Sequence, residues 1–320
     1  MRKAVRSTMA AFLGLTLFAV PQARAWNSIG HMAVGYIAYQ QLTPAVKARV
    51  NALLAMNPDY NLWVSYIPAG TPDDQRDLYI FMMAATWPDE IKLAGSGYTA
   101  DGPNGGDTPP SDPTQANLNV GYTDKTMHKY WHFIDTPFAV GKLALPAVPT
   151  PNVVTQINVF RTVIASNASD DLKSYDLAWI EHLVGDIHQP LHATTRVTAG
   201  MPKGDAGGND VKTIPSPELH AYWDDLLGLG NTSNYATAVT VAQALPAANS
   251  TLAADTNVAD WSLESFKLGK STAYKNPPVG KGLGPYTLTS AYHTAALKVA
   301  QQRIALAGAR LANLLNTNLN

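Results

Sequence analysis

The chain has 320 residues, of which 46% are hydrophobic and 15% are charged, and it contains no cysteine. A chain of this length can bury a sizeable core as one large domain or two small ones. The net charge of −1 excludes a strongly basic protein, so any affinity for phosphate must be local. Without cysteine, disulfides and thiolate zinc sites are excluded, and stability must come from packing and from any bound metal.

The N-terminus has the features of a secretory signal. Basic residues precede an apolar stretch over 9–20 that is too short to span a bilayer, and an Ala-x-Ala cleavage site ends at Ala25. We therefore predict a signal peptide over 1–25, a secreted or periplasmic mature chain, and Trp26 as its first residue. A retained membrane anchor is the alternative, and the cleavage site argues against it. No later stretch is long and apolar enough for a membrane span, so we expect no stable membrane association.

Residues 26–320 have mostly helical periodicity and no evident repeat or linker, which predicts one all-α domain. A helix is expected to open at Ser216-Pro217-Glu218, as a cap, an N1 proline and a first-turn acid. Two regions rich in glycine and polar residues, 94–126 and 194–214, are expected to be long surface loops. The other expected helices run over 28–42, 45–56, 73–86, 153–166, 171–187, 236–247, 258–271 and 290–315.

The segment from His182 to His192 carries three histidines and one aspartate. His182 and Asp186 are four residues apart, so on a helix they share a face. Pro190 should end that helix and let His192 turn back toward the same site. His188 falls on nearly the opposite side and is expected to be structural. The alternative is a helix end with scattered polar residues, because such clusters also occur by chance.

Further histidines and aspartates extend this candidate metal site. His220 and Asp224 repeat the four-residue spacing, and Asp89 and His132 lie beside aromatic residues. Imidazole and carboxylate together favour zinc over calcium or magnesium, which prefer oxygen alone. One zinc needs three or four protein ligands and this chain offers more, so we expect several metal ions. His128, one turn away, is an alternative to His132.

Six short motifs in order resemble the S1/P1 nucleases, trinuclear zinc nucleases that share a fold with zinc-dependent phospholipase C. The resemblance implies a phospholipase C/P1 nuclease-like helical domain with long loops around a trinuclear zinc cleft. The motifs are Trp26 with Gly30-His31, Trp87-x-Asp89, Trp131-His132-Phe133-Ile134-Asp135, the His182–His192 segment, Asp-x-Gly-Gly-Asn at 205–209, and His220-x-x-Trp223-Asp224.

The resemblance also implies three Zn²⁺ ions and a role for each candidate residue. The first zinc would be held by Asp89, His132, His182 and Asp186, the second by His192, His220 and Asp224, and the third by the amine and carbonyl of Trp26, by His31, and by Asp186 as a bridge. Asp89, Lys92 and Asp186 would be catalytic, with Lys92 near the scissile phosphate. Phe133 and Asp135 would bind the substrate by stacking on a base and hydrogen-bonding its edge.

Several of these residues have an ordinary structural alternative. Trp26 and His31 are also consistent with a plain helix start, although cleavage after Ala25 would create a free amine suited to a metal. Lys92 is consistent with a solvated surface lysine, and Phe133 with a core aromatic residue.

The activity implied by the resemblance is that of a secreted zinc-dependent endonuclease. It would hydrolyse phosphodiester bonds of RNA and single-stranded DNA to 5′-phosphate products, with 3′-nucleotidase activity. Its partners would be single-stranded nucleic acid and nucleotide substrates, and we expect a monomer. The alternatives are a zinc-dependent phospholipase C and a non-catalytic secreted zinc-binding protein.

The region 94–126 is a departure from the resembled family, in which the corresponding gap is usually short. Its two ends lead from Asp89 and toward His132, so we expect it to border the cleft. Tyr98 or Tyr122 would then offer an additional stacking position for a base.

Overall fold

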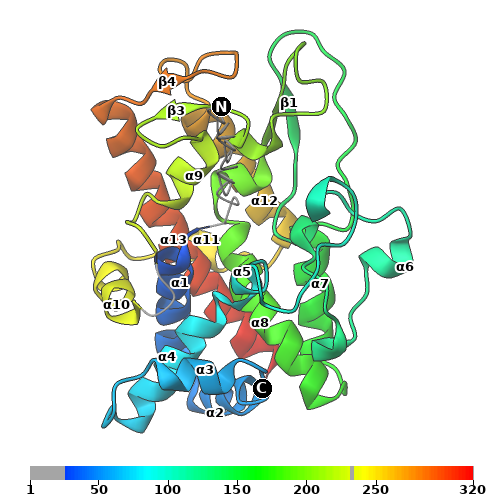
Figure 1. Ribbon diagram of the computed structural model, residues 1–320. Coiled ribbons are helices and arrows are strands. Elements are labelled where there is room, and N and C mark those ends of the chain that lie inside the picture. The colour runs from blue at the N-terminus through cyan, green and yellow to red at the C-terminus, as the bar shows by residue number, and fades with distance from the viewer. Residues whose placement is uncertain (1–25, 231–233, 320) are drawn as a thin grey trace, which may run out of the picture.

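The computed structural model describes residues 26–230 and 234–319, and within them the chain is mostly helical (Figure 1). The predicted signal peptide lies outside these residues. The helices are α1 (Ser28–Gln41), α2 (Pro44–Leu54), α3 (Tyr60–Ser65), α4 (Asp73–Ala84), α5 (Trp87–Glu90), α6 (Pro113–Ala116), α7 (Val153–Ile164), α8 (Asp170–Asp186), α9 (Leu219–Asp224), α10 (Tyr235–Gln243), α11 (Ser250–Ala253), α12 (Val258–Leu268) and α13 (Ser290–Asn318). The expectation of an all-α fold is confirmed.

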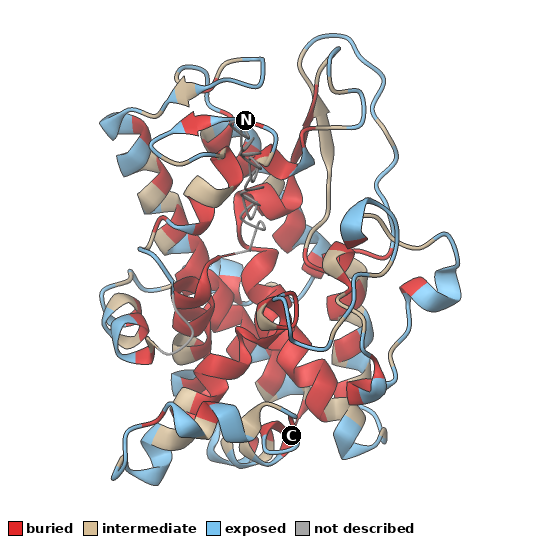
Figure 2. Cartoon of the chain, viewed as in Figure 1, coloured by how far each residue is buried: buried red, intermediate tan, exposed pale blue. Residues whose placement is uncertain are grey.

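Helix α8 runs through the centre of the molecule and positions the His182–Asp186 pair. Ser169 caps its N-terminus by accepting a hydrogen bond from the Leu172 amide, and two aspartates occupy its first turn. From Ser174 to Asp186 every residue is buried, because α8 packs against α1, α2, α7 and α13 (Figure 2). A short 3-10 turn, Pro190–Ala193, follows the helix and carries His192. The predicted helix end before Pro190 is therefore confirmed.

The N-terminal helices begin as their capping residues predict. The Asn27 side chain accepts from the amides of Ile29 and Gly30 at the start of α1, and Thr43 caps α2, with Pro44 as its first residue.

One expected helix boundary was wrong, and some short helices were not expected. Helix α9 begins at Leu219 with Glu218 as its N-cap, not at Ser216, because Thr213 pairs in a strand and its hydroxyl bonds to the Ser216 carbonyl. The short helices α3 and α11 were not predicted, because a single turn or two carries little periodicity.

The strands are short and form two separate pairs. Strand β1 (Pro137–Ala139) pairs in parallel with β2 (Thr195–Val197), and β3 (Thr213–Ile214) pairs in parallel with β4 (Tyr286–Thr287). The β1–β2 pairing brings the segment after His132 beside the segment after His192. The described part of the chain contains no helix long and apolar enough to cross a membrane.

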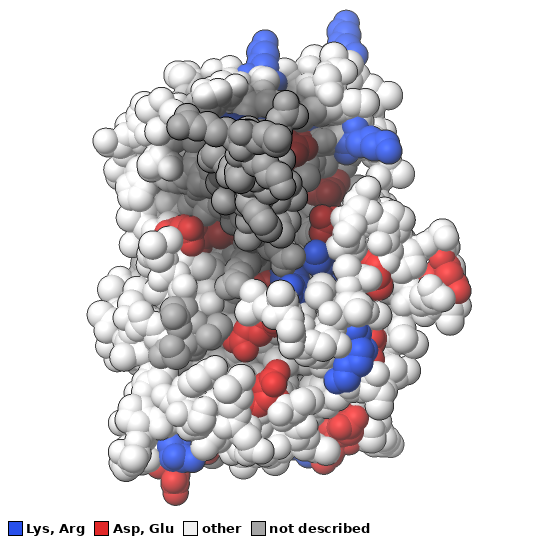
Figure 3. Space-filling model, in the orientation of Figure 1, with Lys and Arg blue, Asp and Glu red and all other residues white. Residues whose placement is uncertain are grey.

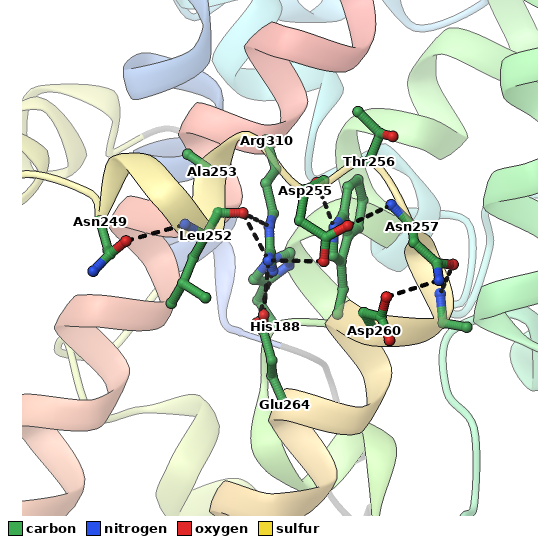
Figure 4. A network of polar contacts seen from close by, with 12 residues as sticks. His188, Asn249, Leu252, Ala253, Asp255, Thr256, Asn257, Asp260, Glu264 and Arg310 are labelled. Carbon is green, nitrogen blue, oxygen red and sulfur yellow. Dashed lines mark hydrogen bonds and ion pairs between the residues drawn. The ribbon is translucent and has the colours of Figure 1, made fainter.

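A buried ionic network joins the C-terminal end of α8 to helices α11, α12 and α13 (Figure 4). The Arg310 guanidinium donates to both carboxylate oxygens of Glu264, at 2.8 Å each, and to the Leu252 carbonyl. It also donates to Nε2 of His188 at 3.0 Å, and Nδ1 of His188 donates to the Val184 carbonyl at 2.8 Å. His188 is thus a structural residue, as its position in the sequence indicates.

Replacing Glu264 by glutamine is expected to destabilise the fold strongly. The carboxylate also accepts from Arg303 at 2.6 Å, so the change removes the counter-charge that two buried guanidinium groups share and leaves Arg310 only the carboxylate of Asp255, 3.8 Å away. Removing one partner of a buried ion pair lowers the free energy of unfolding by about 3–5 kcal/mol. Because the Glu264 side chain is 23% exposed, we expect a loss of about 3 kcal/mol here. Urea denaturation of metal-saturated protein measures the change in the free energy of unfolding.

The matched control is Asp170→Asn, which breaks the exposed ion pair with Arg49 and should cost less than about 1 kcal/mol. An equal loss in the two variants would show that the network contributes no more than a surface pair.

Candidate metal centre

The first group of candidate ligands forms where α1 crosses α8. The His31 ring stacks on the His182 ring with centroids 3.9 Å apart, and His31 Nε2 lies 3.3 Å from Oδ1 of Asp186. Gly185 permits this contact, because a Cβ there would lie 2.8 Å from His31 Nδ1. His182, Asp186 and His31 therefore converge at one point inside the protein, and all three are fully buried.

The second group adds side chains from two segments that lie between α4 and α7 in the sequence. His132 Nδ1 lies 2.9 Å from Nε2 of His182 and 3.0 Å from Oδ2 of Asp186. Asp89, on α5, places Oδ1 3.6 Å from Nε2 of His182 and 3.9 Å from Nδ1 of His132. Asp186 thus has one oxygen near each group, the arrangement that a bridging carboxylate requires.

The third group lies where the turn after α8 meets α9. His192 and His220 have ring centroids 4.9 Å apart, and His220 Nε2 lies 3.6 Å from Oδ2 of Asp224, one helical turn further on. Gln189 donates to the other oxygen of Asp224 at 2.7 Å. His192, His220 and Asp224 offer ligand atoms that all lie within 4.8 Å of one another.

Backbone carbonyls orient three of these imidazoles. Nδ1 of His182 donates to the Ala85 carbonyl, Nδ1 of His192 to the His132 carbonyl, and Nδ1 of His220 to the Gly207 carbonyl, each at 2.8 Å. Each bond places the proton on Nδ1 and leaves the lone pair of Nε2 directed into the site. These carbonyls were not predicted, because a backbone acceptor leaves no signal in residue type.

The side chains fit a bound metal, because several buried ligand atoms have no hydrogen-bond partner within residues 26–230 and 234–319. These atoms include Nε2 of His192, Nε2 of His220 and Oδ2 of Asp224. Burying such atoms without a partner costs about 1–3 kcal/mol each, and more for charged groups. Cations held by nitrogen and carboxylate oxygen would satisfy them.

Ionisation of these residues supports the same conclusion. Burial lowers the pKa of His182 and of His220 to about 4, so both imidazoles are neutral, as metal ligands must be. Burial raises the pKa of Asp186 to about 7, and the nearby Asp89 carboxylate acts in the same direction, although His31 and Lys92 oppose the shift. A cation in the site would provide a compensating charge.

Lys92 is a buried residue of this site rather than a solvated surface lysine. It is 7% exposed, and its ammonium group forms an ion pair with Asp89 one turn earlier. Although burial favours the neutral acid, the charge of Lys92 and its hydrogen bond hold the pKa of the Asp89 carboxyl below its usual range. A positive charge is therefore fixed at the mouth of the metal centre.

A cleft of about 950 Å³ opens onto Lys92 and onto three of the candidate ligands, His132, His192 and His220. The half-buried Phe133 and Asp135 line it beside His132, so the structure places both predicted substrate-binding residues next to the site. The loop residues 104 and 107–109 also line it, which confirms that region 94–126 borders the cleft. In Figure 3, basic and acidic side chains are scattered over the visible face rather than gathered by sign.

Two tyrosines and a histidine in or beside this loop have other roles. Tyr122 is buried in the core, where its hydroxyl bonds to Ser174 and Asn57, so the suggestion that it stacks on a base is wrong. Tyr98 packs its edge against Trp87. His128 is bonded to Asp101 and Asp124 and belongs to none of the three ligand groups, which leaves His132 as the candidate.

Trp26 is fully buried at the start of α1, against Gly30, where a Cβ would lie 2.6 Å from the tryptophan Cβ. The next residue, Asn27, donates its amide hydrogen to the carbonyl of the candidate ligand Asp224 at 3.3 Å. The segment at Trp26 and Asn27 is thus anchored beside the third group. Ligation by the Trp26 amine and carbonyl stays a prediction.

Comparison with known proteins agrees with this geometry. Endonuclease 3 of Arabidopsis thaliana is 30% identical over 163 residues, covering 44% of this chain and 50% of that protein. Endonuclease 4 of the same plant is 29% identical over 181 residues, covering 48% of this chain and 54% of that protein. The chain thus spans about half the length of these relatives. A sequence model of the S1/P1 Nuclease family matches residues 26–320, and the chain belongs to this family.

Proposed function

We propose that this protein is a secreted zinc-dependent endonuclease acting on RNA and single-stranded DNA, with 5′-phosphate products and 3′-nucleotidase activity. The observation that carries the proposal is the cluster of three His/Asp groups, of which His132, His192 and His220 line a cleft together with Lys92 and Phe133. Membership in the S1/P1 nuclease family and similarity to plant endonucleases support it.

The metal would be three zinc ions held by the groups described above. Asp89, His132, His182 and Asp186 would hold one, His192, His220 and Asp224 another, and Trp26, His31 and Asp186 the third. When bound, such ions supply an acidified water and stabilise charge on phosphate oxygens. The chemistry of the donor set, imidazole and carboxylate without thiolate, agrees with zinc.

The protein's own side chains would position the substrate and stabilise developing charge. Lys92, held by Asp89, would place its ammonium group beside the phosphate oxygens, where negative charge grows during hydrolysis. Phe133 would stack on a base, and Asp135 would hydrogen-bond the edge of that base. Because a paired base cannot lie flat on Phe133, this arrangement favours single strands.

The experiment that tests the proposal compares three substrates with and without a chelator. Purified protein is incubated with RNA, single-stranded DNA and phosphatidylcholine, and the ends of the nucleic-acid products are identified. Chelator-sensitive cleavage of RNA and single-stranded DNA with 5′-phosphate ends is expected. Cleavage of phosphatidylcholine alone would indicate a phospholipase C, and zinc binding without any hydrolysis would indicate a binding protein.

The affinity for nucleotide is expected to rise with pH through Asp135. Burial, together with Asp205 and Asp107, raises the pKa of Asp135 to about 7, so the carboxyl is protonated below that pH and charged above it. A charged acceptor binds the N–H groups of a base edge more strongly than a neutral one, by about 1 kcal/mol, or roughly fivefold. The inhibition constant of adenosine, which carries no group that titrates in this range, should therefore fall about fivefold between pH 6 and pH 8.

The Asp135→Asn variant should show no such change, because the amide does not titrate. A fall of equal size in the variant would mean that another group controls binding in this pH range.

A further inference from the structure

The Gly207 carbonyl, which orients His220, lies in a strained loop. Three successive residues have left-handed backbones, with φ values of 50° at Ala206, 60° at Gly207 and 89° at Gly208. A Cβ at position 207 would lie 2.7 Å from the Leu191 carbonyl oxygen, so glycine is required there. A loop in this conformation needs surrounding contacts to hold it in place.

Asp205, at the start of this loop, makes those contacts. Its carboxylate is completely buried and accepts from the Arg196 amide at 2.9 Å, the Arg196 Nε at 3.1 Å and the Tyr274 hydroxyl at 2.7 Å. Its backbone carbonyl accepts from the Gly208 amide at 3.0 Å, which closes the loop around Gly207. The carboxylate thereby fixes the loop that presents the Gly207 carbonyl to His220.

Tyr274 connects the same contacts to the segment that carries His192. It ends a π-helical turn, Gly269–Ala273, whose first residue packs on that segment. A Cβ at Gly269 would lie 2.3 Å from Oγ1 of Thr194 and 3.0 Å from the Pro190 carbonyl oxygen. The Arg196 guanidinium also lies over the Tyr274 ring, 4.9 Å from its centroid. The π-helical turn before Tyr274 therefore packs on the segment that carries His192, while Tyr274 itself binds the residue that begins the His220-orienting loop.

We propose that Asp205, Arg196 and Tyr274 are positioning residues for the His192–His220–Asp224 metal site. They hold the Gly207 carbonyl against Nδ1 of His220, so that Nε2 of this imidazole stays directed at the metal. None of the three lines the cleft, so they act through His220 and not on the substrate. The proposal rests on the metal centre proposed above. Loss of such a contact typically weakens metal affinity 10–100-fold.

The test measures zinc dissociation constants by competition with a chromophoric chelator in Tyr274→Phe, Asp205→Asn and wild-type protein. Tyr274→Phe keeps the ring and removes one hydrogen bond, and Asp205→Asn keeps the shape and removes the charge. The control is Tyr36→Phe, which removes a tyrosine hydroxyl that accepts from Gln243 near the surface. In both loop variants, one zinc is expected to dissociate about 10–100-fold more readily, with the other constants unchanged.

Thermal melts of metal-free and metal-loaded protein separate positioning from general stability. A positioning role predicts a smaller gain in Tm on adding zinc, whereas a purely structural role lowers both melts and leaves the zinc constants intact. The second result, or zinc constants equal to those of Tyr36→Phe, overturns the proposal. If Asp205→Asn fails to fold, Tyr274→Phe alone decides. Wild-type protein that binds three zinc ions but cleaves no nucleic acid would refute the proposed function and leave this test valid.

Discussion

Replacing Asp186 by asparagine is expected to remove nearly all nuclease activity and to lower the zinc content of the protein. The two carboxylate oxygens face different groups, with Oδ1 near His31 and Oδ2 near His132 and His182. An amide keeps one oxygen and replaces the other by a nitrogen that cannot bind a metal. Loss of a contact that only orients a metal ligand lowers metal affinity or activity about 10–100-fold. Loss of the shared ligand itself should therefore lower the rate more than about 100-fold.

The same variant should be no less stable than wild type when both are metal-free. Because burial raises the pKa of Asp186 to about 7, above its unfolded value, the folded protein holds an extra proton below that pH. The stability of the metal-free protein therefore falls as the pH rises toward 7, and the neutral amide does not contribute to that fall. Melts at pH 8, with and without zinc, measure both effects.

Asp170→Asn, an exposed change, serves as the control for activity, zinc content and melting. If Asp186→Asn kept full zinc content and full rate, Asp186 would not be a bridging ligand.

An additional alanine before Trp26 is expected to weaken the binding of the zinc ion assigned to Trp26, His31 and Asp186. The nuclease rate should fall strongly as a result. The nitrogen of a peptide bond is planar and has no lone pair for a metal, whereas a deprotonated α-amine does. Trp26 is buried just before α1, and the next amide is bonded to the Asp224 carbonyl, so the backbone nitrogen of Trp26 lies in a closely packed position. Zinc per protein and nuclease rate are measured for chains beginning at Trp26 and at the added alanine.

A chain carrying an extra alanine at its C-terminus, after Asn320, controls for the change in length. Equal zinc content and equal rates in the two N-terminal forms would contradict ligation by Trp26.

The sequence alone predicted α1 and α8, which carry His31, His182 and Asp186, and it named the candidate ligands. Helical periodicity and capping residues predicted α1, α2 and α8, because these signals act within a few residues of one another. The four-residue spacings, His182 to Asp186 and His220 to Asp224, placed each pair on one face of a helix for the same local reason. Pro190 predicted the end of α8, since proline disfavours helical geometry in the residue before it.

Only the tertiary structure decided which residues from distant segments meet. His128 and His132 are alike in sequence terms, and the fold directs His132 to Asp186 while Asp101 and Asp124 bind His128. Tyr122 faces the core rather than the cleft, because Ser174 on α8 and Asn57 bind its hydroxyl. Contacts of this kind join residues far apart in the chain, and no local pattern encodes them.

The backbone carbonyls that orient the imidazoles could not be predicted from the sequence either. The Gly-Gly-Asn motif marks the loop at 207, but the hydrogen bond from His220 to the Gly207 carbonyl joins two segments that meet only in the fold. Every residue has a backbone carbonyl, so its use as an acceptor is decided by the fold and not by residue type. The sequence thus determined which side chains can bind metal, and the packing of loops around α8 decided how each imidazole is oriented.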